Sequence, residues 1–191
     1  MILALDTSYK YLCITLIENN EIIDAIDLES FKKQSELIML KLDELFKKNN
    51  KKPQDISEVV VSKGPGSYTG IRIAMVVAKM IATQLNIPLK TISTLKLYAN
   101  NEAKTAVIMD ARSKRCYFGV YDKGECLVED QIIEISDLAS YSEYNFVGDL
   151  SLIDETNNFR PVSQCFLNNL NQLELVTDSH KLTPSYLKKY E

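Results

Sequence analysis

The sequence predicts an α/β protein built from two tandem lobes, of which the second is reduced. A pattern of strands and tight turns at the start of the chain recurs in its second half, and the first half continues with alternating strands and helices. The 191 residues suffice for two small lobes. Apolar residues make up 46% and charged residues 25%, which is typical of globular proteins.

The recurring pattern occupies residues 2–22 and 106–126, which align without a gap at an offset of 104 residues. In each copy an apolar strand ends in an aspartate, Asp6 or Asp110, and two more strands follow. A two-residue turn that favours positive φ separates the last two strands: Asn19-Asn20 or Lys123-Gly124. Duplication is one interpretation. Two unrelated hairpins with similar turns is the alternative, because few residues are identical.

The rest of the first half predicts the remaining elements of a complete lobe. Its apolar periodicity indicates helices at 34–48 and 69–85 and strands at 58–62 and 89–92. Ser93 or Thr94 is expected to cap a further helix. Three antiparallel strands followed by strand–helix crossovers is the element order of a ribonuclease-H-like lobe.

The second half predicts a weaker version of the same order. Three strands reach to about residue 135, a short helix lies near 137–142, a strand at 144–148, and a tail without clear periodicity follows. Two such lobes in tandem are the architecture of the actin, Hsp70 and sugar-kinase (ASKHA) superfamily, which is a fold-level analogy. We therefore expect an N-terminal lobe at 1–102 and a C-terminal lobe at 103–180, with the segment 181–191 packing back on the first.

The predicted helices differ in how their apolar residues are distributed. Helix 34–48 has one broad apolar face, with Leu37 and Leu40 outside it among charges; the face consists of Ile38, Met39, Leu42, Leu45 and Phe46. Helix 69–85 is apolar nearly all round. Its stripe of Ala74, Ala78 and Ala82 would let another helix approach closely.

A helix that is apolar nearly all round must be covered on more than one side. The sheet covers one side, and a partner's helices could cover the other in a four-helix interface. The alternative is that the two helices cover each other within the chain. The predicted partner interface consists of Leu37, Leu40, Lys41, Glu44, Arg72, Met75, Ala78, Lys79 and Ala82.

A glycine-rich turn, SKGPGSYTGIRI at 62–73, joins a strand to a helix. Glycine permits close approach of a ligand, and free amides at a helix start favour an anion, although the Gly-Lys-Ser/Thr of a Walker A loop is absent. The alternatives are an anion or nucleotide contact and a purely structural turn. The candidate contact residues are Asp6, Thr7, Gly64, Pro65, Gly66, Ser67, Thr69 and Gly70. The loops after Asp6 and Asp110 lack glycine, so these aspartates are interpreted as loop caps.

The sequence predicts neither a catalytic residue nor a metal site. His180 is the one histidine, whereas a catalytic zinc needs about three protein ligands. The four cysteines form no C-x-x-C pair, and no G-x-S-x-G is present. The chain starts without the basic n-region of a signal peptide, and its longest apolar run is too short for a bilayer. We therefore expect a cytoplasmic protein.

Charge gives a further indication about partners. A net charge of −4 argues against a protein that coats nucleic acid by itself. Residues 30–52 are rich in lysine, which we interpret as a solvated helix face; the alternative is a patch that steers an acidic partner or tRNA. Tyr9-Lys10-Tyr11 and Lys114-Arg115 could contact RNA, but the sequence does not gather aromatic and basic residues on one predicted face.

Several motifs resemble a known family along nearly the whole chain. GPGSYTGIRI after a buried strand is similar to the signature of the bacterial tRNA threonylcarbamoyladenosine biosynthesis family TsaB (YeaZ-like). ILALDTS, ISTLKLYA, MDARSKRCYFGVY and LTPSYLKKY are similar to that family's other landmarks. One departure is Gln34-Ser35-Glu36, where the family usually has His-Ser-Glu. It puts in doubt any contact that the histidine would make.

The resemblance implies a non-catalytic scaffold subunit that supports a catalytic paralogue, TsaD, together with the ATPase TsaE. That complex attaches threonylcarbamoyl to adenosine 37 of tRNAs that read codons beginning with A. The resemblance implies no intrinsic cofactor, with ATP or ADP at the interface of the complex, and tRNA contacted indirectly. A homodimer through the predicted partner interface is expected when the partner is absent. No membrane association is expected.

Two alternatives come from other functional classes. One is a free-standing ATP-dependent phosphotransferase of the same superfold, which would need glycine-rich phosphate loops. The other is a protease, which would need a metal-binding pair of histidines. Neither feature is present in the sequence.

Overall fold

The first lobe has the ribonuclease-H-like order that the sequence predicts. The computed structural model describes residues 1–30, 32–99 and 103–187. The lobe comprises β1 (Ile2–Asp6), β2 (Tyr11–Glu18), β3 (Glu21–Glu29), α1 (Gln34–Lys48), the 3₁₀ turn η1 (Pro53–Asp55), β4 (Glu58–Ser62), α2 (Tyr68–Leu85), β5 (Leu89–Ile92) and α3 (Thr94–Tyr98). Its strands run in the order β5-β4-β1-β2-β3, with β1, β4 and β5 parallel and β2 antiparallel to its neighbours. Ser93 caps α3 by accepting from the Lys96 amide, as predicted.

The second lobe repeats this topology in a shorter form. It comprises β6 (Thr105–Arg112), β7 (Arg115–Asp122), β8 (Glu125–Glu134), the 3₁₀ segment η2 (Ile135–Tyr141) and β9 (Asn145–Gly148). The order β8-β7-β6-β9 matches β3-β2-β1-β4 of the first lobe, so the reduced second lobe is confirmed. The helix predicted near 137–142 is a 3₁₀ segment.

The duplicated hairpins have the turn geometry that their residues predict. Asn19 and Asn20 have φ values of 54° and 61°, and Lys123 and Gly124 have 49° and 85°. Positive φ at both central residues matches the twist of a two-residue hairpin. The turns occupy equivalent places in the two sheets, whose strand orders match over four strands, and this favours duplication over coincidence.

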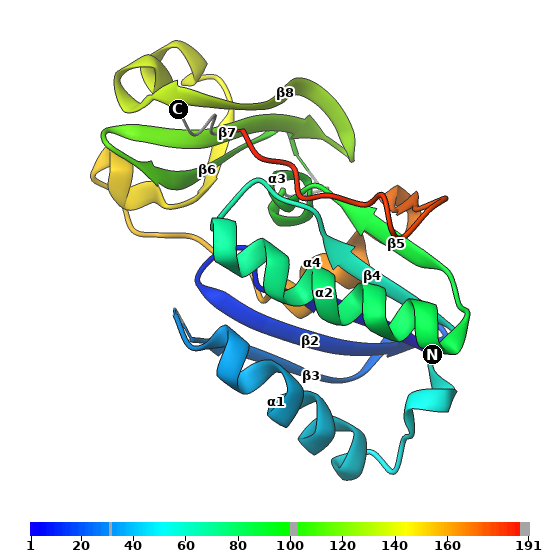
Figure 1. Cartoon of the computed structure of the whole chain (residues 1–191). Coiled ribbons are helices and arrows are strands. Elements are labelled where there is room, and N and C mark those ends of the chain that lie inside the picture. Colours follow the sequence, from blue (N-terminus) through cyan, green and yellow to red (C-terminus); the bar gives the residue numbers. More distant parts are fainter. Residues whose placement is uncertain (31, 100–102, 188–191) are drawn as a thin grey trace.

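The first sheet is buried on both faces (Figure 1). Leu3 and Leu5 of β1 pack into a core with α1 and α2 on one face. Ala4 points to the other face, into a core that it shares with Val107 and Met109 of the second lobe. The shared core joins the lobes through apolar contact.

The tail that lacked periodicity returns to the first lobe. Its first element, the 3₁₀ turn η3 (Leu150–Ile153), still packs in the core of the second lobe. The elements that return are α4 (Val162–Asn168), η4 (Leu170–Gln172) and β10 (Glu174–Leu175). Figure 1 shows α4 behind the first sheet, where it packs on β2 and β3, and β10 pairs antiparallel with β5. This differs from the predicted assignment of 103–180 to the second lobe. The physical reason is that α4 covers the sheet face opposite α1 and α2, which would otherwise be exposed there.

Residues 176–187, which we call the C-terminal strap, run along α2. The Lys79 ammonium donates to the carbonyls of His180 and Leu182, at 3.3 and 3.2 Å. The Ser185 amide donates to the Lys63 carbonyl at 2.7 Å, beside the glycine-rich turn. Within the described ranges, no helix has the length and apolar character needed to cross a membrane.

Candidate partner interface and interlobe cleft

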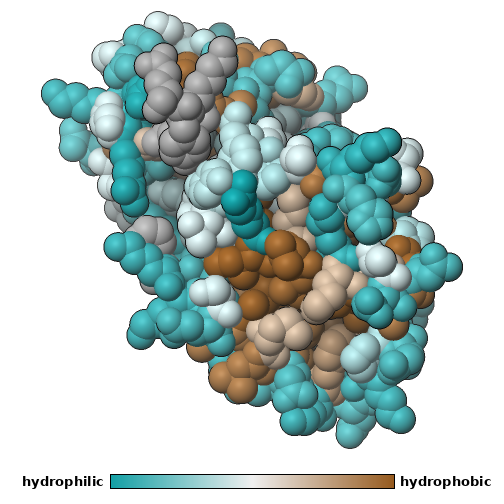
Figure 2. Space-filling view, in the orientation of Figure 1, coloured by the Kyte–Doolittle hydropathy of each residue, from teal (hydrophilic) through white to brown (hydrophobic). Residues whose placement is uncertain are grey.

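An apolar patch lies exposed on α1 and α2. Its residues are about half or more exposed to solvent: Met39 49%, Leu40 53%, Val76 63% and Met80 47%. Figure 2 shows the apolar surface over both helices, in the orientation of Figure 1. We call these four residues the helix patch. Val76 and Met80 are four residues apart and therefore lie on one face of α2.

The structure corrects three residues of the predicted interface. Met75, Ala78 and Ala82 are buried, with exposures of 3%, 0% and 4%, and cannot contact a partner. The alanine stripe faces the first sheet and not another chain, because small side chains let α2 approach the strands closely. The Thr7 hydroxyl lies in the same contact, where it accepts from the Ala74 amide at 3.0 Å.

The assignment of α1 side chains also needs correction. Met39 was placed on the core face but is half exposed, whereas Leu37 is half-buried against the α1–α2 core. Lys41 and Glu44 pair with each other at 2.7 Å and line a groove beside β3. They therefore lie on the flank of α1 that faces β3, with Glu44 one helical turn after Leu40. Leu40 is the predicted α1 residue that belongs to the patch.

Arg72 and Lys79 contact the C-terminal strap. The Arg72 guanidinium lies over the Tyr68 ring, 4.2 Å from its centroid, and donates to the Tyr186 hydroxyl at 2.6 Å. Lys79 holds the strap by the two carbonyls described above. The strap therefore occupies the side of α2 that these two residues were predicted to offer a partner.

The glycine-rich turn is packed against the chain's own backbone. A Cβ atom on Gly66 would collide with the Ser8 carbonyl, and one on Gly70 with the Thr7 carbonyl. The same turn is anchored by the Ser67 amide, which donates to the Ser8 carbonyl at 2.7 Å. These contacts account for the glycines without a ligand and favour the structural interpretation of the turn.

Asp6 and Thr7 lie inside the first lobe, which corrects their assignment as candidate ligand contacts. The Asp6 carboxylate is fully buried and accepts from the Ser62 hydroxyl, the Tyr98 hydroxyl and the Ser8 amide. Burial raises the pKa of the Asp6 carboxyl despite these hydrogen bonds. Thr7 is also fully buried, and its hydroxyl donates to the Gly70 carbonyl at 2.6 Å. Both side chains link β1 to the elements around it.

A cleft of about 600 Å³ opens between the two lobes. Its walls come from the loop after β1, the end of β3, the glycine-rich turn and the β6–β7 hairpin. The lining residues are Tyr9, Lys10, Glu29, Gly66, Ser67, Tyr68, Asp110, Ala111, Arg112 and Tyr117. Of the predicted anion-contact residues, Gly66 and Ser67 line it, while Gly64 and Pro65 are buried and Thr69 is exposed at the start of α2.

Asp149, which the sequence did not single out, links the lobes at this cleft. It is almost fully buried and accepts from Lys10 Nζ at 2.5 Å, from the Tyr9 hydroxyl and from the Asp110 amide at 2.9 Å. Burial, and then the hydrogen bond to Asp149, raise the pKa of the Tyr9 hydroxyl. The available signal was an acid directly after the predicted strand 144–148, at its carboxyl end.

Gln34 supports this link from α1. Its buried side chain donates from Nε2 to the Tyr9 carbonyl at 3.1 Å. The position where the family usually has histidine therefore holds the loop that carries Tyr9 and Lys10. Asp110, by contrast, has an exposed side chain that accepts from the Arg112 amide at 2.6 Å, in agreement with its interpretation as a loop cap.

Asp149→Ala is expected to lower the free energy of unfolding by about 2 kcal/mol and the melting temperature by about 5 °C. The substitution leaves Lys10 and the part-buried Tyr9 hydroxyl without their acceptor. Asp43→Ala is the matched control, because it removes an exposed Lys–Asp pair on α1. Thermal unfolding followed by circular dichroism compares them. Equal shifts in the two variants would show that Asp149 adds nothing beyond a surface ion pair.

In the described part of the chain, no group of three histidine, cysteine, aspartate or glutamate side chains is placed to hold a metal ion. The four cysteines are unpaired as disulfides, and three are buried. Burial raises the pKa of the Cys165 thiol to about 12, which disfavours a nucleophilic thiolate.

Comparison with known proteins gives concordant results. Residues 29–158, more than half of the chain, match the family described as "TsaD: tRNA N6-adenosine threonylcarbamoyltransferase". A Bacillus subtilis protein named "tRNA threonylcarbamoyladenosine biosynthesis protein TsaB" is 36% identical over 144 residues, which are 71% of this chain and 63% of that protein. The chain thus spans less than two thirds of this relative's length.

Two further similarities extend over most of the chain. A protein of the same name from Buchnera aphidicola, of the subspecies from Acyrthosiphon pisum, is 26% identical over 87% of this chain and 82% of its own length. The solved structure "YeaZ from Pseudomonas aeruginosa" superposes with a TM-score of 0.79 at 21% identity, covering 97% of this chain and 99% of the other. This structural similarity shows a shared fold.

Proposed function

The chain belongs to the family described as TsaD, tRNA N6-adenosine threonylcarbamoyltransferase, and within it to the TsaB (YeaZ-like) proteins, and we propose that it acts in tRNA threonylcarbamoyladenosine biosynthesis. Its role there is that of a non-catalytic scaffold. It binds the catalytic TsaD homologue and keeps that subunit active, together with a TsaE-type ATPase.

The observation that carries this proposal is the helix patch. Two neighbouring surface helices expose Met39, Leu40, Val76 and Met80 on one side of the molecule. Contiguous exposed apolar surface on a soluble domain marks an interaction site. Two helices that present such a face suit a partner that presents two more, which gives a four-helix interface.

The interlobe cleft supports a scaffold better than a phosphotransferase. Phosphate-binding loops use glycine so that backbone amides reach the phosphates. Here Gly66 and Gly70 are packed against the chain's own carbonyls. Glu29 and Asp110 line the cleft beside Lys10 and Arg112, so the lining has no excess of positive charge to bind a polyphosphate. ATP or ADP is therefore proposed to bind at the interface of the complex rather than in this cleft.

Reconstitution tests the proposal. Threonylcarbamoylation of tRNA by the catalytic homologue and TsaE is measured with and without this chain, and complex formation is followed by light scattering on a sizing column. We expect activity to depend on this chain, and the chain to co-elute with the catalytic homologue. Alone, it is expected to elute as a homodimer through the helix patch.

Two results would contradict the scaffold role. A chain that neither binds nor stimulates the catalytic homologue has no such function. A chain that hydrolyses ATP by itself, with phosphate release lost on substitution of cleft residues, is an enzyme in its own right.

A further inference from the structure

The turn of the β6–β7 hairpin presents two positively charged side chains at the mouth of the interlobe cleft. Arg112, Ser113 and Lys114 have φ values of 63°, 57° and 58°, a left-handed conformation that non-glycine residues seldom adopt three times in succession. Two hydrogen bonds hold this turn in place: the Arg112 amide donates to the Asp110 carboxylate, and the Ile135 amide donates to the Lys114 carbonyl. The Arg112 and Lys114 side chains are exposed there.

An aromatic pair lies on the first-lobe side of the same cleft. Tyr68, which lines the cleft, stacks on Tyr186 of the C-terminal strap with ring centroids 5.0 Å apart. Both residues are more than a third exposed, at 39% and 37%. The Arg72 guanidinium lies over the Tyr68 ring, so this wall combines a stacking surface with a cation.

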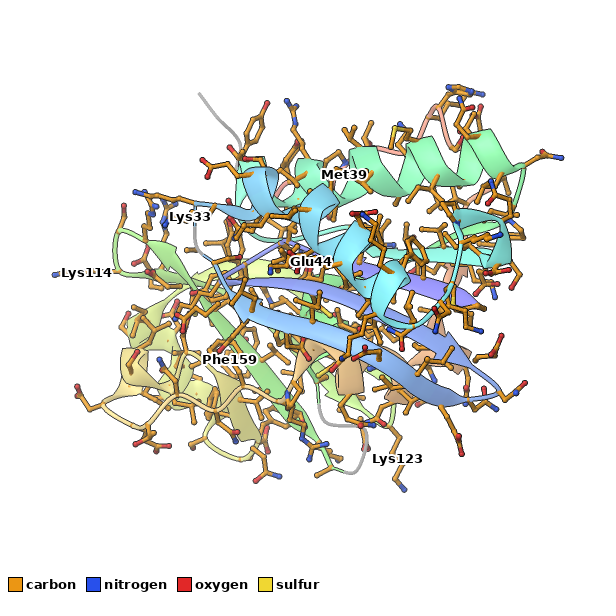
Figure 3. The ribbon with its side chains drawn as sticks, turned by 90° about the horizontal axis from the view of Figure 1, so that it is seen from below. Lys33, Met39, Glu44, Lys114, Lys123 and Phe159 are labelled. Atoms are coloured by element: carbon orange, nitrogen blue, oxygen red, sulfur yellow. The ribbon has the colours of Figure 1, made fainter. Side chains whose placement is uncertain are left out.

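A further cation comes from the start of α1. Lys33 is exposed and directly precedes Gln34, which is hydrogen-bonded to the cleft residue Tyr9. Figure 3 shows Lys33 and Lys114 at the same end of the molecule, and Lys123 at the opposite end. We call Lys33, Arg72, Arg112 and Lys114, with the Tyr68–Tyr186 pair, the cleft rim.

The lysine-rich helix α1 differs from this rim in its charge balance. Lys41 pairs with Glu44, Lys47 with Asp43 and Lys48 with Asp24, each at 2.7 Å. These pairs engage three of the lysines of residues 30–52 with nearby acids at the surface, which favours the solvated-face interpretation for α1. The folded chain gathers aromatic and basic side chains at the cleft rim instead, from segments far apart in sequence.

The arrangement of charge indicates the kind of ligand. Glu29 and Asp110 line the cleft together with Lys10 and Arg112, so charges of both signs meet there. Lys33, Arg72 and Lys114 of the cleft rim are not among the residues that line the cleft, so positive charge predominates along the rim. A buried polyphosphate would meet the carboxylates in the cleft, but a chain of single phosphates that follows the rim would not. Aromatic rings beside arginine and lysine are the means by which proteins bind unpaired bases of RNA.

We propose that the cleft rim binds a single-stranded segment of RNA, with phosphates at Arg112 and Lys114 and a base on the exposed Tyr68 ring. That this RNA is the loop of the tRNA being modified rests on the proposed function. The net charge of −4 makes binding by the isolated chain weak and dependent on low salt. Binding is stronger where the catalytic homologue supplies further contacts.

The test uses the double substitution Arg112→Asn and Lys114→Asn, because asparagine tolerates the left-handed conformation. Lys123→Asn is the matched control: its φ is 49°, and it lies in the other hairpin turn of the same lobe. Binding of a fluorescent anticodon stem-loop, from a tRNA that reads codons beginning with A, is followed by anisotropy over a salt series. The chain is measured alone and in complex with the catalytic homologue.

We expect the double variant to lose affinity about tenfold, and its slope of log K against log salt to fall by about one to two, since two phosphate contacts are lost. Lys123→Asn should match the unmodified chain. Tyr68→Ala should lower affinity with an unchanged salt slope, because it removes stacking and no charge.

Three outcomes would overturn the inference: equal affinity of all variants and the unmodified chain, equal losses in the double variant and Lys123→Asn, or displacement of the RNA by ATP at low concentration. The last would identify a free-nucleotide site. Failure here is distinct from failure of the proposed function, since anisotropy on the chain alone needs no catalytic homologue. A chain that stimulates tRNA modification but shows equal RNA binding in all variants remains a scaffold without an RNA site.

Discussion

Val76→Glu combined with Met80→Glu is expected to abolish binding of this chain to its catalytic homologue while the chain stays folded. Both side chains are about half or more exposed, so glutamate at these positions remains in water in the free chain. In the complex the two carboxylates would lie unpaired in an apolar interface, which is costly. We expect the dissociation constant to rise more than about a hundredfold, which is about 3 kcal/mol.

Sizing with light scattering and thermal unfolding decide this prediction together. The double variant should elute alone, should not stimulate tRNA modification, and should melt within about 2 °C of the unmodified chain. Leu127→Glu is the matched control, because Leu127 is 45% exposed but lies on β8 in the second lobe. If the double variant still co-elutes with the catalytic homologue, the interface lies elsewhere.

Ala78→Glu, two residues from Val76, is expected to have the opposite result. Ala78 is fully buried where α2 packs on the first sheet, among apolar side chains. A carboxylate at this position would therefore have neither water nor a cation to contact. Overpacking and an unpaired buried charge together should cost at least about 4 kcal/mol, a large part of a typical protein's stability. The variant should be recovered as insoluble or partly unfolded protein.

Circular dichroism and solubility after expression measure this effect, with Val76→Glu as the control on the same helix. Ala78→Gly separates the causes, since it leaves the space empty without adding charge and should cost about 1 kcal/mol. A soluble Ala78→Glu variant that melts normally and merely fails to bind its partner would restore the original prediction, in which the alanine stripe faces the partner.

The division of α2 into a buried and an exposed face could not be predicted from its sequence. Amphipathic helices reveal their buried face because polar residues mark the other. In α2 both faces are apolar, so the pattern left Ala78 and Val76 equivalent. The first sheet and Thr7 contact the side of α2 that has the smallest side chains, and these contacts determine which face of the helix is buried.

The residues of the cleft show the same limit. Tyr68 and Tyr186 are 118 positions apart in numbering, yet they stack, and Tyr9 and Lys10 meet Asp149 across the lobes. Short-range patterns contain no information on such pairs. Asp6, at the end of an apolar strand, had the same local pattern as Asp110. The structure buries the first and exposes the second, because Tyr98 and Ser62 surround Asp6.

The sequence by itself determined the two-lobed fold, the order of its elements along the chain and its hairpins, because these depend on local periodicity and on turn residues such as Asn19-Asn20. Its motifs also indicated the family. Tertiary structure alone decided which face of α2 is exposed, that α4 and β10 return to the first lobe, and which side chains form the cleft rim. Those outcomes depend on contacts between segments distant in sequence, whose energies appear only when the chain has folded.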